Sequence, residues 1–298
     1  MKILLTGSTG FLGTFIRNRT SLQKTNFIFG STSDCHSNHD LVRFQSLYQE
    51  AEKLIKDDLF AIIHCAAIIP SSFSAATYEE VFLPNIQMME NLCQLAFQKH
   101  IRKFIYISSF GSMQTPEQLD IRDYYTLVKI TGELYCRMQE AHGIQTASLR
   151  ISSPFGEWQH QRTVVRIFVE QALKNEPLEV YGTGSREQNF TYAGDVLAAI
   201  EAVVKAPKIS GVYNIVGPES ISMLKLAQTI VNISGSSAPI VCGRQPDPQE
   251  LYRPEYNYTR AKRELDYSPC SLEKGLTQYI AWIKKQQQGI LHETVSRC

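Results

Sequence analysis

Tyr125 stands four places before Lys129 in the stretch RDYYTLVKITGELYCRMQE, residues 122–140. Positions i and i+4 of a helix share one face, so this phenol and this ammonium could share a pocket. Such a pair can take a proton from a hydroxyl group if the positive charge lowers the pKa of the phenol by about three units. That requires roughly 4 kcal/mol, which one ammonium at about 4 Å supplies at an effective dielectric near 20. Tyr258 and Lys262 have the same spacing, so spacing alone does not decide between the two pairs.

A glycine-rich stretch, TGSTGFLG at residues 6–13, follows the apolar run KILL and precedes a helical pattern. Gly7, Gly10 and Gly13 would permit a tight turn, a close approach of the backbone to a pyrophosphate, and close packing of the helix on the strand. The helix N-terminus would present N–H groups and a partial positive charge to the phosphates. A strand before the turn and a helix after it are the context that this motif requires, so the stretch predicts a dinucleotide-binding turn.

The residues after the second apolar run, NFIFG, bear on whether the dinucleotide is NAD or NADP. An acidic residue there commonly binds the ribose hydroxyls of NAD, but this chain has Ser31 and Thr32, and no carboxylate before Asp34. Small hydroxyl residues leave room for a 2′-phosphate, which Arg17 or Arg19 of the first helix could reach. We expect NAD or NADP, with a slight preference for NADP.

Short β-rich apolar runs alternate with helical patterns through the first half of the chain, and this alternation predicts a parallel sheet with helices on both faces. The expected fold class is α/β, a doubly wound parallel (Rossmann) sheet with a smaller mixed α/β C-terminal lobe that binds the substrate. Residues 1–153, with a returning segment at about 190–215, would form the dinucleotide-binding domain. Residues 154–189 and 216–298 would form the substrate-binding lobe, and a cleft between the two would hold the ligand.

The composition excludes several classes of function. With 298 residues, 43% hydrophobic, 20% charged and a net charge of +1, the chain is typical of an ordinary globular protein, and its total charge indicates neither nucleic-acid nor membrane binding. We expect no signal peptide, because the first residues lack a long apolar region, and no membrane-spanning segment, because no run of 18 apolar residues occurs. The seven cysteines are scattered and form no Cys-x-x-Cys pair, so we expect no metal site, no disulfide framework and a cytoplasmic location.

Several motifs in order, TGSTGFLG, HCAA, YISS and YYTLVK, followed by EVYGTGSREQNFTYAGDV and GVYNIVG, give the chain its resemblance to a known family. The chain resembles the extended short-chain dehydrogenase/reductases and, within them, the NAD-dependent epimerase/dehydratase branch that acts on nucleotide sugars, UDP-glucose 4-epimerase among them. The resemblance implies that Ser109, Tyr125 and Lys129 are catalytic and that Tyr258 and Lys262 are not. It implies a homodimer joined through helices near 86–99 and 124–141.

The resemblance also implies binding roles for individual residues. The cofactor-binding residues would be Gly7, Gly10, Phe11, Leu12, Gly13, Ser31, Ala66, Ala67, Asn85, Tyr125 and Lys129. The substrate-binding residues would be Ser109, Ser153, Gln188, Arg186 and Arg244.

Some of these residues also have an ordinary structural interpretation. Asn85 could instead be a helix cap. Ser109 could simply bond its own backbone at the end of a strand, although its neighbour Ser108 is the better candidate for that role. His64 and Cys65, at the end of the apolar run AIIHCAA, are expected to be a buried, hydrogen-bonded histidine and its neighbour rather than metal ligands, because no second ligand is suitably spaced.

The chain departs from the family pattern in three places. Phe110 and Gly111 follow Ser109 where family dehydratases have an aspartate and a glutamate, which argues against a dehydratase. Gln188 and Gln245 stand near positions where the family has arginines for the nucleotide diphosphate, and Ser153 stands where it has an asparagine. A neutral glutamine cannot replace the charge of an arginine. Either the nearby Arg186 and Arg244 bind the diphosphate instead, or the substrate is not an ordinary nucleotide diphosphate sugar.

Three functions follow from these observations. The first is a nucleotide-sugar epimerase that oxidises a sugar hydroxyl, most simply at C4, and returns the hydride to the opposite face. The second is a reductase of the same family, which takes NADPH to a 4-keto sugar or another carbonyl. The third is a non-catalytic dinucleotide-binding protein that has kept the fold.

Overall fold

A computed structural model of the chain describes residues 2–23, 27–30, 58–70, 76–113, 123–251, 253, 255–287 and 289. Ser31, expected to contact the cofactor, lies outside the described residues, as do Thr32 and Asp34. Within the described part of the chain, no helix is both long enough and apolar enough to cross a membrane.

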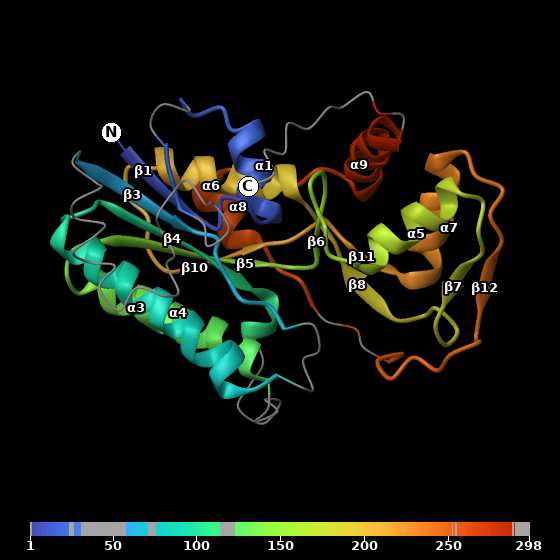
Figure 1. Ribbon diagram of the computed structural model, residues 1–298, viewed down its shortest axis with the longest axis horizontal. Helices are drawn as coiled ribbons and strands as arrows, with labels where there is room; N and C mark the ends of the chain where they lie inside the picture. Colours follow the sequence, from blue (N-terminus) through green and yellow to red (C-terminus); the bar gives the residue numbers. More distant parts are fainter. Residues whose placement is uncertain are drawn as a thin grey trace.

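Five segments between residues 2 and 151, and a sixth at residues 212–215, form a six-stranded parallel sheet (Figure 1). The alternation of apolar runs and helical patterns in the first half of the chain predicts such a sheet. The strand order is β10-β5-β4-β3-β1-β2. The strands are β1 (Lys2–Thr6), β2 (Phe27–Gly30), β3 (Leu59–His64), β4 (Lys103–Ser109), β5 (Gln145–Ile151) and β10 (Val212–Ile215). Their apolar runs are almost continuously buried because helices cover both faces of a doubly wound sheet.

Two layers of helices cover the sheet (Figure 1). One face carries α3 (Leu83–Gln98) and α4 (Tyr124–Glu140), which pack against each other and enclose a core that includes Met88, Phe104 and Cys136. The other face carries α1 (Phe11–Arg19), α6 (Ala193–Lys205) and α8 (Thr259–Leu265). The expected fold class, a Rossmann-like parallel sheet between helices, is confirmed.

The strands that follow β1 lie on opposite sides of it, so the order of the strands in the sheet reverses at β1. Such a reversal creates a site for a ligand. β2 pairs with one edge of β1 and β3 with the other, both in parallel. In open parallel sheets of this kind, ligands bind outside the carboxyl ends of the strands at the point of reversal. Thr6, at the end of β1, and His64, at the end of β3, mark that point.

A smaller lobe of mixed structure lies at the carboxyl edge of the sheet (Figure 1). Its helices are α5 (Val164–Leu173), α7 (Met223–Ser234) and α9 (Leu272–Gln287), and its strands form three two-stranded sheets. The strands are β6 (Pro154–Phe155) with β9 (Thr191–Tyr192), β7 (Leu178–Val180) with β12 (Ile240–Cys242), and β8 (Glu187–Asn189) with β11 (Ser220–Ser222).

The chain passes between the lobes more than once. After β9 it returns to form α6 and β10, and after the second lobe it returns again as α8, which packs on α6 and β10. Lys103, at the start of β4, anchors this return, because its buried ammonium donates to the carbonyls of Val203, Val204 and Ala206 at the end of α6. The exact division into two domains, at residue 153 with a returning segment, stays a prediction.

Candidate active site

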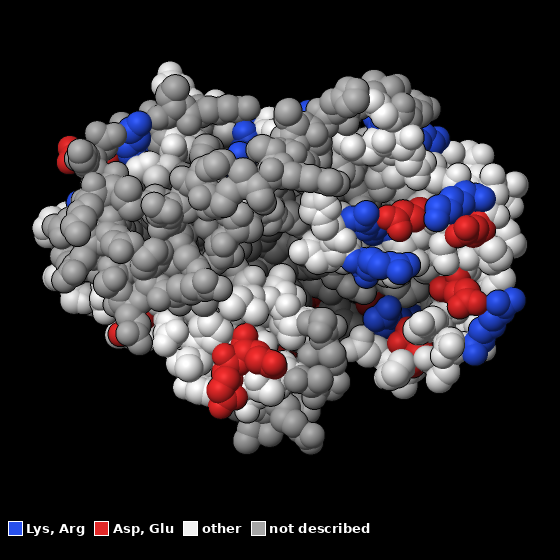
Figure 2. All heavy atoms as spheres, in the orientation of Figure 1, with Lys and Arg blue, Asp and Glu red and all other residues white. Residues whose placement is uncertain are grey.

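A cavity of about 1000 Å³ opens at the carboxyl edge of the sheet, between the two lobes. It appears as a hollow between the two halves of the molecule in Figure 2. Residues from the ends of β1, β3, β4 and β5 line it from the first lobe, and the segments around β6, α5 and β8 line it from the second. The lining includes most of the residues expected from the sequence: Gly7, Gly10, Phe11, Leu12, Gly13, Ala66, Ala67, Ser109, Tyr125, Lys129, Ser153 and Gln188.

The turn between β1 and α1 requires glycine at two positions. Gly7 has φ +66°, and a Cβ there would lie 2.6 Å from the backbone nitrogen of Ala66. A Cβ on Gly13 would lie 2.0 Å from the carbonyl oxygen of Gly7. No side chain caps the N-terminus of α1, where Gly10 is the N-cap residue. The turn therefore brings a backbone without side chains and the N–H groups of a helix to the cavity, which is what a pyrophosphate requires.

Tyr125 and Lys129 face the cavity from the first turns of α4. The helix begins at Tyr124 because Asp123 caps it: the Asp123 carboxylate accepts hydrogen bonds from the Thr126 N–H at 3.0 Å and the Thr126 hydroxyl at 2.6 Å. Lys129 is only 4% exposed. Its Nζ donates to the carbonyl oxygen of Ile107 at 2.9 Å and lies 5.3 Å from the centre of the Tyr125 ring.

The electrostatics of this pair differ from the expectation. Burial, and secondly the Asp123 carboxylate, raises the pKa of Tyr125 to about 12. Burial also lowers the pKa of Lys129 to about 8, although Cys65 and Glu133 oppose that change. In this structure the charge of Lys129 therefore does not outweigh the effect of burial on the pKa of Tyr125. The ammonium lies over the ring of Tyr125, donates to a strand carbonyl, and is itself difficult to keep charged in a buried site.

Ser108 and Ser109, at the end of β4, both line the cavity, and their partners are the reverse of those expected. The Ser109 hydroxyl oxygen accepts a hydrogen bond from the Gly111 N–H at 3.2 Å. Ser108, expected to bond its own backbone, instead donates to the Glu133 carboxylate at 2.6 Å. Arg150 of β5 donates to both oxygens of the same carboxylate, at 2.8 and 2.6 Å. This network joins α4 to the ends of β4 and β5, and so fixes the elements that carry Tyr125 and Ser109.

The second lobe brings neutral side chains to the cavity. Ser153 and Gln188 both line it, and the Gln188 amide donates to the Ser153 hydroxyl. Arg186 and Arg244, expected to contact the substrate, are absent from the described lining. The Arg186 guanidinium pairs with Asp247 at 3.0 Å and donates to Gln249 at 3.0 Å, while Arg244 pairs with Glu179 at 2.9 Å. Both arginines are engaged by neighbouring acids in this structure, and their contact with a substrate stays a prediction.

Asn85 does not line the cavity as described, but its side chain holds the backbone of a residue that does. Its amide oxygen accepts from the Ile68 N–H at 2.9 Å, and its amide nitrogen donates to the carbonyls of Ile68 at 3.0 Å and Val81 at 2.6 Å. The helix-cap alternative is wrong, because Phe82 is the N-cap of α3. Asn85 instead fixes Ile68, which lines the cavity beside Ala66 and Ala67. Its contact with a cofactor stays a prediction.

The surroundings of His64, Cys65 and Tyr258 give each of them a structural role. His64 is buried, bonds the Thr6 hydroxyl through Nδ1 at 2.8 Å and stacks on Tyr106, and burial lowers its pKa to about 3. Burial likewise raises the pKa of Cys65 to about 12, so its thiol stays protonated. No group of three or more potential metal ligands occurs among the described residues. Tyr258 packs on Tyr267 beside α8, outside the described cavity lining.

The sequence reasoning missed three polar residues of the lining, Gln159, Gln161 and Thr163. They belong to the segment EWQHQRT, residues 157–163, between β6 and α5. A signal was present, because this polar run lies a few residues beyond the end of β5, at the edge of the sheet where loops gather around the ligand.

Comparison with known proteins assigns the family. The model of the NAD dependent epimerase/dehydratase family matches residues 3–216, more than half of the chain. The chain belongs to this family.

Relatives of the NAD dependent epimerase/dehydratase family match almost the whole chain. An uncharacterized UDP-glucose epimerase of Bacillus subtilis, YtcB, is 27% identical and covers 97% of this chain and 100% of its own length. UDP-glucuronic acid decarboxylase 1 of Danio rerio is 26% identical and covers 96% of this chain and 73% of its own length. The crystal structure of UDP-glucuronic acid 4-epimerase from Bacillus cereus, in complex with UDP-glucuronic acid and NAD, is 25% identical with a TM-score of 0.78, and covers 96% and 100% of the two chains.

Members of this family are NAD-dependent enzymes, and the residues of the cavity fit that cofactor. The glycine turn would hold its diphosphate, with α1 directing N–H groups at it, and Ala66, Ala67 and Lys129 line the path beyond the turn. The slight preference for NADP finds no support in this family. Of the two arginines that could reach a 2′-phosphate, Arg19 pairs with Glu157 at 3.3 Å.

Proposed function

We propose that the protein is an NAD-dependent epimerase that inverts a hydroxyl-bearing carbon of a nucleotide sugar, at C4. One observation carries the proposal: Ser109, Tyr125 and Lys129 line the same cavity as the glycine turn of α1. The B. subtilis relative and the B. cereus structure, whose names describe UDP-sugar epimerases, support the substrate class. Phe110, in the position of a dehydratase acid, packs against Tyr256 with ring centres 4.5 Å apart and offers no proton donor for loss of water.

Three residues of the cavity, Ser109, Tyr125 and Lys129, would each have a defined role in this reaction. The Ser109 hydroxyl would hydrogen-bond the sugar oxygen, and the Tyr125 hydroxyl would take and return the proton of that oxygen. Lys129, fixed by Ile107, would hold positive charge beside the phenol. NAD, when bound, supplies the acceptor and then the donor of the hydride. Oxidised nicotinamide also carries a positive charge, which opposes the high pKa that burial gives Tyr125.

The substrate half of the cavity is polar but uncharged. Ser153, Gln159, Thr163 and Gln188 line it, and Lys129 is the one lysine or arginine in the described lining. A diphosphate would therefore be held by neutral amides and hydroxyls, or by Arg186 after it leaves Asp247. We infer a weaker grip on the nucleotide diphosphate than an arginine fork would give.

This neutrality favours one alternative, a reductase that takes a carbonyl substrate without a diphosphate. The two functions differ in what happens to the nicotinamide. An epimerase keeps the same bound NAD through many turnovers, whereas a reductase consumes one reduced nicotinamide for each product.

The protein is further proposed to form a homodimer through α3 and α4. These helices lie together on the outside of the sheet (Figure 1), and their outer surface exposes large apolar side chains. Phe97 on α3 is 50% exposed, and Leu134 and Met138 on α4 are 55% and 61% exposed. Apolar residues gathered in this way commonly mark a protein interface. A cytoplasmic location is proposed as well, on the five described cysteines, all of which are free thiols.

The experiment that tests the function measures both the sugar-nucleotide product and the redox state of the nicotinamide. Purified protein loaded with NAD is incubated with UDP-glucose or UDP-glucuronic acid, and products are resolved by chromatography and by proton NMR. We expect the 4-epimer at many equivalents per bound NAD, with no net reduced nicotinamide. Consumption of NADPH or NADH with a keto sugar, and no epimer, would support the reductase and contradict the epimerase.

A further inference from the structure

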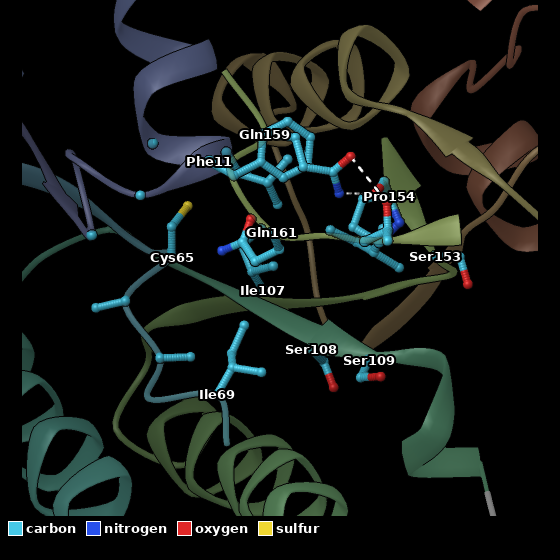
Figure 3. Close-up of a pocket in the computed structure, with 18 of the residues that line it drawn as sticks. Phe11, Cys65, Ile69, Ile107, Ser108, Ser109, Ser153, Pro154, Gln159 and Gln161 are labelled. Atoms are coloured by element: carbon cyan, nitrogen blue, oxygen red, sulfur yellow. Dashed lines mark hydrogen bonds between the residues drawn. The ribbon is translucent and has the colours of Figure 1, made fainter. Parts of the chain in front are cut away.

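Gln161 reaches into the cavity from the second lobe. It lies in the loop between β6 and α5, and its carboxamide points toward Cys65 and Ile107, below Phe11 (Figure 3). Within the described part of the chain, this carboxamide has no hydrogen-bond partner. Gln161 is an exposed residue, so its carboxamide is open to a ligand that enters the cavity and is not needed by the fold.

The backbone that carries Gln161 is held firmly on both sides. Gln159 donates to the Pro154 carbonyl at 2.9 Å and accepts from the Thr163 hydroxyl at 3.3 Å. The Thr163 N–H donates to the carbonyl of Gln161 itself at 2.9 Å. Ahead of the loop, Trp158 packs edge-on against Phe15 of α1, with ring centres 5.8 Å apart. The position of Gln161 is therefore built in advance rather than adopted by a loose loop.

The side chains that surround Gln161 determine what it can bind. Phe11, Ile107 and Cys65 are apolar or protonated and offer no strong acceptor. Phe11 is the first residue of α1, whose N-terminus has no side-chain cap. The glycine turn lines the same cavity and is suited to hold a dinucleotide diphosphate, which is a group rich in acceptors.

We propose that Gln161 hydrogen-bonds the bound NAD and so acts as a clasp through which the second lobe retains the cofactor. The amide N–H would donate to a diphosphate oxygen, or to a ribose hydroxyl beside it. The inference rests on the proposed function only for the position of NAD in this cavity and does not depend on the sugar. A clasp of this kind suits an epimerase, which must keep its nicotinamide between the two hydride transfers.

The test measures NAD binding without any sugar nucleotide. NAD affinity is determined by titration calorimetry for the wild-type protein, Gln161→Ala and the control His160→Ala. His160 is exposed in the same loop and lies outside the described cavity lining, so its loss tests for a general effect on the loop. Thermal unfolding of each protein without NAD verifies that the substitutions leave the fold intact.

We expect Gln161→Ala to weaken NAD binding about tenfold, the factor for one hydrogen bond, through faster dissociation. His160→Ala should bind like the wild type. Gln161→Glu then identifies the partner: charge repulsion makes NAD binding weaker than in Gln161→Ala if the partner is the diphosphate, whereas a ribose hydroxyl can donate to the carboxylate and binding is retained. Unchanged binding by Gln161→Ala, or an equal loss in His160→Ala, would overturn the clasp alone. Failure of the wild type to bind NAD would overturn the cofactor assignment with it.

Discussion

Replacing Lys129 with methionine should make the protein more stable at neutral pH while it removes activity. Methionine fills a similar volume without a charge. Lys129 is 4% exposed, and burial lowers its pKa from 10.5 to about 8. Its ammonium therefore costs folding free energy that a neutral side chain would not.

The magnitude follows from that change in pKa. Each unit corresponds to about 1.4 kcal/mol, so a fall from 10.5 to about 8 corresponds to about 3 kcal/mol of destabilisation at pH 7. Methionine also gives up the hydrogen bond to the Ile107 carbonyl, which costs about 1 kcal/mol. We expect Lys129→Met to be about 2 kcal/mol more stable than the wild type at pH 7.

The sign of the pH dependence provides the sharper test. Between pH 8 and 10.5 the unfolded chain binds more protons at Lys129 than the folded chain does, so the stability of the wild type rises through that window relative to the variant. Urea unfolding of both proteins at pH 7, 8.5 and 10 measures the difference directly. The advantage of Lys129→Met should be full at pH 7 and mostly lost by pH 10. A variant less stable than the wild type at pH 7, or a difference independent of pH, would refute this reasoning.

Three further substitutions test other parts of the structure. Gly13→Ala should destabilise the protein by about 1–3 kcal/mol and abolish tight NAD binding, because the new Cβ would lie 2.0 Å from the Gly7 carbonyl oxygen; urea unfolding and NAD titration measure both, and unchanged NAD binding would contradict the assigned turn. Gln188→Arg should tighten the binding of UDP about tenfold by adding a cation to a neutral lining; calorimetry with UDP measures it, and no gain would place the diphosphate elsewhere. Leu134→Glu together with Met138→Glu should yield folded monomers in sedimentation velocity, because both side chains are exposed in the wild-type fold; an unchanged sedimentation coefficient would exclude this face as the interface.

The sequence predicted those parts of the site that depend on a few neighbouring residues. Gly7 and Gly13 are required by the backbone of one turn, and the turn is recognisable from the strand and helix around it. Tyr125 and Lys129 share a face because helical geometry places them there. Both features depend on a short stretch of chain, so the amino-acid sequence of that stretch predicts them without knowledge of the rest of the fold.

The partners of long side chains could not be predicted in the same way. Arg186 was expected at the substrate, but the segment that contains Asp247 folds beside it, and the Arg186 guanidinium forms an ion pair with the Asp247 carboxylate. Ser108 was expected to bond its own backbone, but α4 brings Glu133 to it. Such choices depend on which distant segments meet, and the sequence does not encode that in any local pattern.

The pKa of Tyr125 in this structure is raised, not lowered, for a related reason. An attraction estimated from one lysine omits the cost of burial, and burial determines the balance at both Tyr125 and Lys129. Only a packed structure shows how much water each group has lost.

A comparison of Tyr125→Phe with the wild type tests the central claim most directly, namely that this phenol moves the proton beside bound NAD. NAD affinity and epimerisation of UDP-glucose are measured for both proteins. We predict that Tyr125→Phe binds NAD within about twofold of the wild type and loses at least about a hundredfold in turnover, the usual contribution of a general base. A Tyr125→Phe protein that epimerises its substrate at the wild-type rate would contradict the account.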